Sequence, residues 1–217
     1  MKNKWMKAMQ MLLCATFFIL HSSFFISCSE EETETSEWDN WQERNETYFA
    51  SLPDLLSQDS APWMRIKSYS LDPATEGKPT DYVYAKIIEQ GSETECPAYT
   101  DSVRVVYQGR LIPTNTYPEG SVFSSTVSGN FSVATASTSR MLVSKLVEGM
   151  ATALQHMHRG DYWRIYIPHE LGYDEQSQTS SSGSVTIPAY STLIFDVLLV
   201  DFAPTGETLP SWSSRRR

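Results

Sequence analysis

One change of hydrophobic period constrains this chain more than any other feature of its sequence. Three segments alternate apolar and polar residues, as half-buried antiparallel strands do: residues 63–71, 82–88 and 102–112. The period then becomes helical at Leu146, Met150, Ala153, Leu154 and Met157. Strand-like residues 163–167 and the apolar run 193–200 follow. One helix among about five strands predicts an α+β domain.

The element count also predicts how this domain is arranged. We expect an antiparallel, twisted sheet of about five to six strands wrapped around one short helix, because the helix must cover the concave face. Residues 193–200 are apolar almost throughout, which predicts a central strand buried on both faces. Residues 175–184 are polar and serine-rich, which predicts a loop.

The 217 residues suffice for one domain with appendages. We predict five parts: a lipoprotein-type signal peptide (1–27), an acidic tether (28–37), an N-terminal helix and link (38–61), a main domain (62–203) and a polar tail (204–217).

The extra N-terminal helix is predicted from aromatic residues at helical spacing: Trp38, Trp41, Tyr48 and Phe49. Pro53 is expected to help end it. The aromatic face either packs on its own domain or serves as a contact surface for an envelope partner.

The first residues of the chain resemble a secretory signal peptide. Three lysines precede an apolar run, which is the order found in secretory signals. Residues 24–28 resemble a relaxed bacterial lipobox, which implies that Cys28 is lipidated and anchors the chain to the cell envelope, at the periplasmic or surface face of the outer membrane. Ordinary cleavage that leaves a free thiol is the alternative.

The composition argues against several classes of function. The net charge is −9 and no basic stripe is visible, so we expect no nucleic-acid partner. The sequence has no nucleophile elbow, P-loop or His-Glu-x-x-His pattern. His156, His158 and His169 are interpreted as surface or structural residues, and Cys96 has no disulfide partner left in the predicted mature chain. We therefore expect no metal and no cofactor.

An ordered set of motifs carries a family resemblance. Three segments resemble those of the FKBP-type (FK506-binding-protein) peptidyl-prolyl isomerase family, in the lipoprotein-anchored bacterial branch of that family. They are Val103–Leu111, Gly120–Ser125 and Leu146–Met157. Ile167-Pro168, Leu171-Gly172-Tyr173, Ile187-Pro188 and Leu193–Leu199 continue the match in order, so that the motif core covers residues 100–202.

The resemblance implies a site. Its catalytic residues would be Tyr107, Phe123, Val147 and Tyr173. Its substrate-binding residues would be Leu146, Met150, Ile187, Phe195, Ser124 and Met141. The family pattern implies that a backbone N–H at Leu146-Val147 donates a hydrogen bond to a substrate carbonyl. Met150 would form the floor of the pocket, and the Tyr173 hydroxyl would donate a hydrogen bond to the ligand.

The resemblance also implies a function, namely isomerisation of X–Pro bonds in exported proteins by a monomer, without covalent chemistry. Two residues differ from the family pattern, since Ser124 replaces an aspartate and Met150 a tryptophan. These differences predict reduced activity. They leave open the alternative of a weak or inactive FKBP-like module that holds peptides in the envelope.

Overall fold

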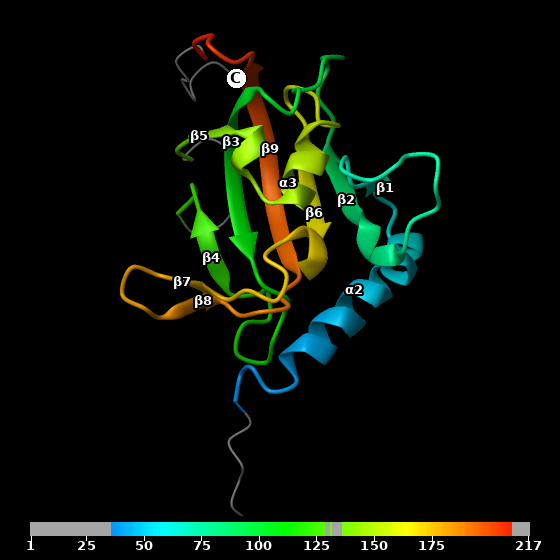
Figure 1. The fold of residues 1–217 in the computed structure, drawn as a ribbon, viewed down its shortest axis with the longest axis vertical. Coiled ribbons are helices and arrows are strands. Elements are labelled where there is room, and N and C mark those ends of the chain that lie inside the picture. Colours follow the sequence, from blue (N-terminus) through cyan, green and yellow to red (C-terminus); the bar gives the residue numbers. More distant parts are fainter. Residues whose placement is uncertain (1–35, 129–130, 132–135, 210–217) are drawn as a thin grey trace, which may run out of the picture. The chain divides into compact units, whose positions relative to one another are not determined.

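The computed structural model describes residues 36–128, 131 and 136–209. Its main sheet has seven antiparallel strands in the order β1-β2-β6-β9-β3-β4, with β5 also paired to β3 (Figure 1). These strands are β1 Trp63–Lys67, β2 Tyr82–Glu89, β3 Ser102–Arg110, β4 Val122–Ser125, β5 Ser139–Leu142, β6 Tyr162–Ile167 and β9 Leu193–Ala203. The remaining strands, β7 Gln178–Thr179 and β8 Val185–Ile187, form a separate hairpin.

The described part of the chain has two α-helices, neither of which interrupts the sheet. They are α2 Trp41–Gln58 and α3 Glu148–Leu154, with three 3-10 turns, η1 Pro79–Asp81, η2 Val143–Lys145 and η3 His169–Leu171. Figure 1 shows α3 lying across one face of the sheet. The predicted α+β class, with one short helix on an antiparallel sheet and an extra N-terminal helix, is confirmed.

Contacts with the sheet bury α3 almost completely. All residues of α3 after Glu148 are buried: Gly149, Met150, Ala151, Thr152, Ala153 and Leu154. A Cβ at Gly149 would lie 2.4 Å from Ile167 Cγ2 and 3.0 Å from Val83 Cγ1, so glycine allows this close approach. The helix is shorter than the predicted span, because Leu146 and Val147 are extended and Met157 belongs to a turn that follows Leu154.

Strand β9 occupies the centre of the sheet, between β6 and β3. Its residues are buried on both faces from Leu193 to Leu199. The apolar run contains one carboxylate, Asp196, whose side chain is 1% exposed. It accepts a hydrogen bond from Arg164 Nε at 2.7 Å and is paired with Arg110 as well. These two arginines supply the partners that a buried charge requires.

The aromatic face of α2 packs on the chain's own domain. Three of its apolar residues are buried: Trp41, Phe49 and Leu52. Asn45 is fully buried and its Oδ1 accepts a hydrogen bond from the Thr192 N–H at 2.8 Å. The Trp41 indole donates to the Ser191 hydroxyl at 2.9 Å. These bonds fix α2 to the segment that leads into β9, and the buried face is not available to a partner.

Pro53 does not end α2, contrary to the expectation from sequence, and the helix continues to Gln58. Proline removes one backbone N–H and crowds the carbonyl one turn earlier, but a helix can continue past it with a bend. In the last turn the Asp54 carbonyl accepts hydrogen bonds from the Ser57 hydroxyl at 2.7 Å and the Gln58 amide at 3.2 Å. These bonds satisfy a carbonyl group near the end of the helix.

Four strands were not predicted from sequence. Strands β4 and β5 have four residues each, with no fully buried position, so their hydrophobic pattern is weak. Strands β7 and β8 lie in and beside the serine-rich segment 175–184, which was predicted to be a plain loop. Short strands with polar residues have little periodicity to detect.

Several predictions concern residues outside the described part of the chain. These are the signal peptide (1–27), Cys28, the tether up to residue 35 and the tail beyond residue 209. Within the described residues, no helix combines the length and apolar character that a membrane span would need.

Candidate functional site

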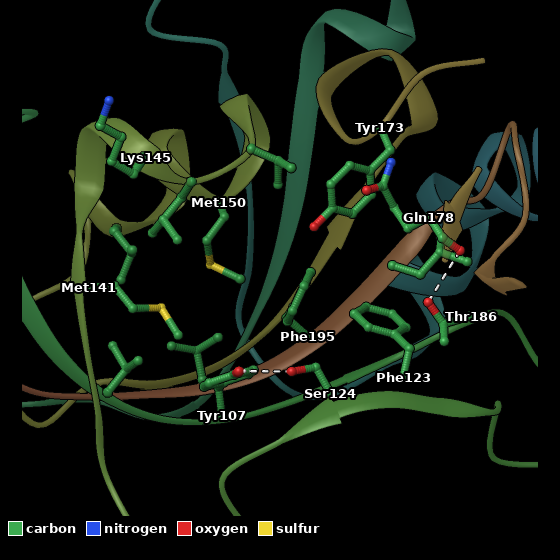
Figure 2. Close-up of a pocket in the computed structure, with 16 residues that line it drawn as sticks. Tyr107, Phe123, Ser124, Met141, Lys145, Met150, Tyr173, Gln178, Thr186 and Phe195 are labelled. Carbon is green, nitrogen blue, oxygen red and sulfur yellow. Dashed lines mark hydrogen bonds between the residues drawn. The ribbon is translucent and has the colours of Figure 1, made fainter. Parts of the chain in front are cut away.

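A cavity of about 380 Å³ lies between α3 and the concave face of the sheet (Figure 2). It is lined by Val105, Tyr107, Phe123, Ser124, Met141, Lys145, Leu146, Val147, Met150, Leu154, Tyr173, Gln178, Thr186, Ile187, Phe195 and Val197. The lining is mostly apolar and aromatic, with a few polar groups, as small-molecule and peptide sites usually are.

The cavity brings together all ten site residues that the sequence predicted: Tyr107, Phe123, Val147, Tyr173, Leu146, Met150, Ile187, Phe195, Ser124 and Met141. They come from six separate parts of the chain, namely β3, β4, β5, the start of α3, the turn after η3, and β8–β9. Their shared location is observed, whereas their roles in binding and catalysis stay predictions.

Six further lining residues were missed: Val105, Lys145, Leu154, Gln178, Thr186 and Val197. Val105 lies two residues from Tyr107 on β3, and Val197 lies two residues from Phe195 on β9. Residues two apart on a strand share a face, so the strand period could have predicted both valines. Gln178 and Thr186 belong to the hairpin, and of the family motifs only Ile187-Pro188, directly after Thr186, reaches it. Lys145 directly precedes the predicted pair Leu146-Val147, and its charge is not typical of an apolar cavity wall.

Three aromatic rings form one wall of the cavity. Phe123 meets Phe195 edge to face, with ring centroids 5.5 Å apart and planes at 84°. Tyr107 lies 6.4 Å from Phe195, centroid to centroid. Gly109 makes this packing possible, because a Cβ there would lie 2.6 Å from Phe195 Cε1 and 2.7 Å from Phe123 Cε2. Glycine at this strand position therefore supports the aromatic wall.

Two hydroxyl groups give this wall its polar contacts. The Tyr107 hydroxyl and the Ser124 hydroxyl form a hydrogen bond of 2.8 Å. Figure 2 shows the Tyr173 hydroxyl directed into the cavity, toward Met150 and Phe195. Burial, and to a smaller extent the nearby Tyr107, raises the pKa of Tyr173 above 10.0. Tyr173 thus stays protonated at neutral pH and can donate a hydrogen bond to a ligand.

The backbone before α3 presents a further donor. Val147 is the residue that caps α3, with φ −57° and ψ 148°, and its carbonyl accepts from the Ala151 N–H at 3.0 Å. Within the described residues the Val147 N–H donates to no protein acceptor. Met150, 7% exposed, lies in the first turn of α3 and lines the cavity. A carbonyl group bound in this cavity could accept from Val147 while an apolar ring rests on Met150.

The three histidines and the one cysteine among the described residues lie outside the cavity lining. His156 Nδ1 lies 2.9 Å from the Thr152 carbonyl, and His169 lies between Glu170 and Asp174. Burial raises the pKa of the Cys96 thiol, which favours its protonated form. The described residues contain no cluster of three or more potential metal-binding side chains.

Comparison with known proteins identifies the domain. Residues 93–200 match the family model described as FKBP-type peptidyl-prolyl cis-trans isomerase. This chain carries an FKBP-type isomerase domain. The match contains nearly all of β3 to β9, and with them every residue that lines the cavity.

Relatives of the FKBP domain occur in several organisms. The chain is 28% identical over 191 residues to a macrophage infectivity potentiator of Trypanosoma cruzi, covering 88% of this chain and 84% of that protein. It is 38% identical over 116 residues to an FKBP-type 22 kDa peptidyl-prolyl cis-trans isomerase of Escherichia coli K12, covering 54% of this chain and 48% of that protein. An outer membrane protein MIP of Legionella longbeachae is 31% identical over 115 residues, covering 53% and 42%.

The chain thus spans less than half the length of the two bacterial relatives. A solved structure, that of FkpA from Escherichia coli, superposes with a TM-score of 0.52 at 22% identity, covering 76% of this chain and 62% of that one. At this identity the likeness concerns the FKBP fold alone.

The aromatic wall of the FKBP domain can be tested at Gly109. In Gly109→Ala the new methyl group must displace Phe195 or Phe123, which we expect to cost about 1–3 kcal/mol of stability and to weaken binding of a proline peptide. Thermal unfolding and titration calorimetry measure the two effects. Glu76→Ala, at an exposed position outside the cavity lining, is the control and should leave peptide binding unchanged. Unaltered peptide binding in Gly109→Ala would show that the wall does not depend on this contact.

Proposed function

We propose that this chain catalyses cis–trans isomerisation of X–Pro bonds in exported proteins, by binding the twisted bond in the aromatic cavity. The observation that carries the proposal is the gathering of Tyr107, Phe123, Val147 and Tyr173, which are distant in sequence, around one cavity in an FKBP-type domain. A cavity of about 380 Å³ can take a proline ring and the groups next to it.

The chemistry of the amide bond explains why an apolar cavity suits this reaction. Rotation about the bond faces a barrier of about 18–20 kcal/mol that amide resonance creates. In the twisted transition state this resonance is lost, so the amide is less polar than in its planar form. Water solvates the planar amide better, and a cavity that excludes water favours the twisted one. Each ~1.4 kcal/mol of such preference accelerates the reaction about tenfold.

The polar groups of the cavity have roles that follow from their positions. The Val147 N–H would donate a hydrogen bond to a carbonyl oxygen of the substrate and so fix the peptide. The Tyr173 hydroxyl, directed inward and protonated, would donate to a second carbonyl. Phe123 and Phe195 would hold the proline ring between them and Met150. No covalent bond forms or breaks, which is consistent with a lining that contains no nucleophile paired with a base.

Exchange spectroscopy by NMR tests this proposal directly. We expect the purified chain to accelerate cis–trans exchange of a peptide such as Ala-Leu-Pro-Phe well above the rate in buffer. Phe123→Ala should lower the acceleration by on the order of tenfold or more, because a wall of the cavity is lost. Tyr173→Phe should lower it by about three- to tenfold through loss of one hydrogen bond. Exchange no faster than in buffer would end the proposal.

A second candidate function is a binding module with little or no turnover. The observation that favours it is the pair Ser124 and Met150, where the family pattern has aspartate and tryptophan. Ser124 does preserve a hydrogen bond to Tyr107, at 2.8 Å, but it brings no negative charge. Met150 fills the floor with a flexible chain that has no N–H group. If Ser124→Asp and Met150→Trp raise the exchange rate, the natural chain is a weakened catalyst.

The place of action is part of the proposal. We infer an exported, lipid-anchored envelope protein from the lysines, the apolar run and Cys28 near the start of the chain. The name of the Legionella longbeachae relative, an outer membrane protein, agrees with this location. Mass spectrometry of protein extracted from the producing cell's envelope checks it. We expect an acylated Cys28 at the N-terminus, and an unmodified Cys28 preceded by residues 1–27 would contradict it.

A further inference from the structure

The cavity of the FKBP domain has an unbalanced charge. Among the described side chains that line it, Lys145 is the charged one, and the others are apolar or neutral. Ser124 occupies the position where the family pattern has a carboxylate, so no negative charge of the lining offsets the lysine. A substrate that extends from this cavity past Lys145 would therefore meet a positive charge.

The position of Lys145 allows it to act on residues beside the proline rather than on the proline itself. It ends η2 and lies two residues before Val147, whose N–H is the proposed carbonyl donor. Figure 2 shows its ammonium group at the rim, on the side away from Tyr173 and turned out of the cavity. A lysine side chain is long and flexible, so the charge can reach groups that extend over the rim.

Among the described residues, none forms an ion pair or hydrogen bond with the Lys145 ammonium group. Nearby acids are engaged elsewhere. Glu148, three residues later, accepts hydrogen bonds from the hydroxyls of Ser68 and Ser70. At the opposite end of the cavity, Asp174 Oδ1 lies 3.4 Å from His169 Nδ1. The lysine charge thus remains available to a ligand.

We propose that Lys145 selects substrates by charge, so that the site favours X–Pro segments with an aspartate or glutamate next to the proline over segments with a lysine or arginine there. This inference rests on the proposed function and names the substrate class of the same site. The ammonium group attracts a carboxylate and repels a second cation. Because Lys145 is exposed, water and salt weaken the effect, and we expect a preference of about two- to fivefold rather than an absolute rule.

The test uses two series of proline peptides, one with Glu, Gln or Lys before the proline and one with the same residues after it. For each peptide the dissociation constant and the exchange rate are measured by NMR with the full chain. In at least one series, Glu should be favoured over Lys by about two- to fivefold in 0.05 M salt. In 1 M salt the ratio should approach one, because the Debye length falls to about 3 Å.

Two variants assign this preference to Lys145. Lys145→Ala should remove most of it, and Lys145→Glu should reverse its direction. Arg140→Ala is the matched control. It removes one positive charge from β5, at an exposed residue next to Met141 that does not line the cavity, and should leave the ratio as it is.

The outcomes separate this inference from the proposed function. Acceleration of all peptides with equal constants for Glu and Lys, or a ratio unchanged in Lys145→Ala, overturns the charge selection and leaves isomerisation in place. A charge-dependent affinity without acceleration overturns catalysis and supports Lys145 as the residue that selects the ligand. Absence of both binding and acceleration overturns both.

Discussion

The close approach of α3 to the sheet is the contact on which the rest of the site depends. At Gly149 there is no room for a side chain, because Ile167 Cγ2 and Val83 Cγ1 already occupy the space that a Cβ would take. This contact holds a helix of seven residues across the strands, although so short a helix would not be stable alone. Met150 then forms the floor, and the extended residues before the helix lie at the cavity edge.

The aromatic wall depends on a second missing side chain, at Gly109. There β3 leaves room for Phe123 from β4 and Phe195 from β9, which meet edge to face. Both glycines allow close packing, but glycine inside a helix or strand destabilises the fold by about 0.5–1 kcal/mol relative to alanine. The gain is a cavity with a mostly apolar lining, the kind of surrounding on which the proposed non-covalent catalysis of amide rotation relies.

Much of this fold and site could be predicted from the sequence, and the reasons are physical. The long strands β3 and β9 and the apolar stripe of α3 have periods that a reader can count. The ten predicted cavity residues came from an ordered set of motifs, and the structure places them together. Their roles are a matter for experiment.

The rest could not be predicted because local pattern does not determine it. Helix α2 passes Pro53 because tertiary contacts at Asn45 and Leu52 hold its preceding turns. The β7–β8 hairpin encloses a serine-rich turn, and its strands of two and three residues are too short to show a period, yet it brings Gln178 and Thr186 to the cavity. The carboxylate of Asp196 within an apolar strand could be explained only once Arg110 and Arg164 were seen beside it.

The account rests on one claim, that proline peptides bind between α3 and the aromatic wall. Methyl NMR of the chain, labelled at Met, Ile, Leu and Val and titrated with a proline peptide, tests this claim most directly. We predict shifts at Met141, Leu146, Val147, Met150 and Ile187, with those of Ile66 and Val83, buried outside the cavity lining, unchanged. Shifts confined to methyl groups away from the cavity, with those five unmoved, would contradict it.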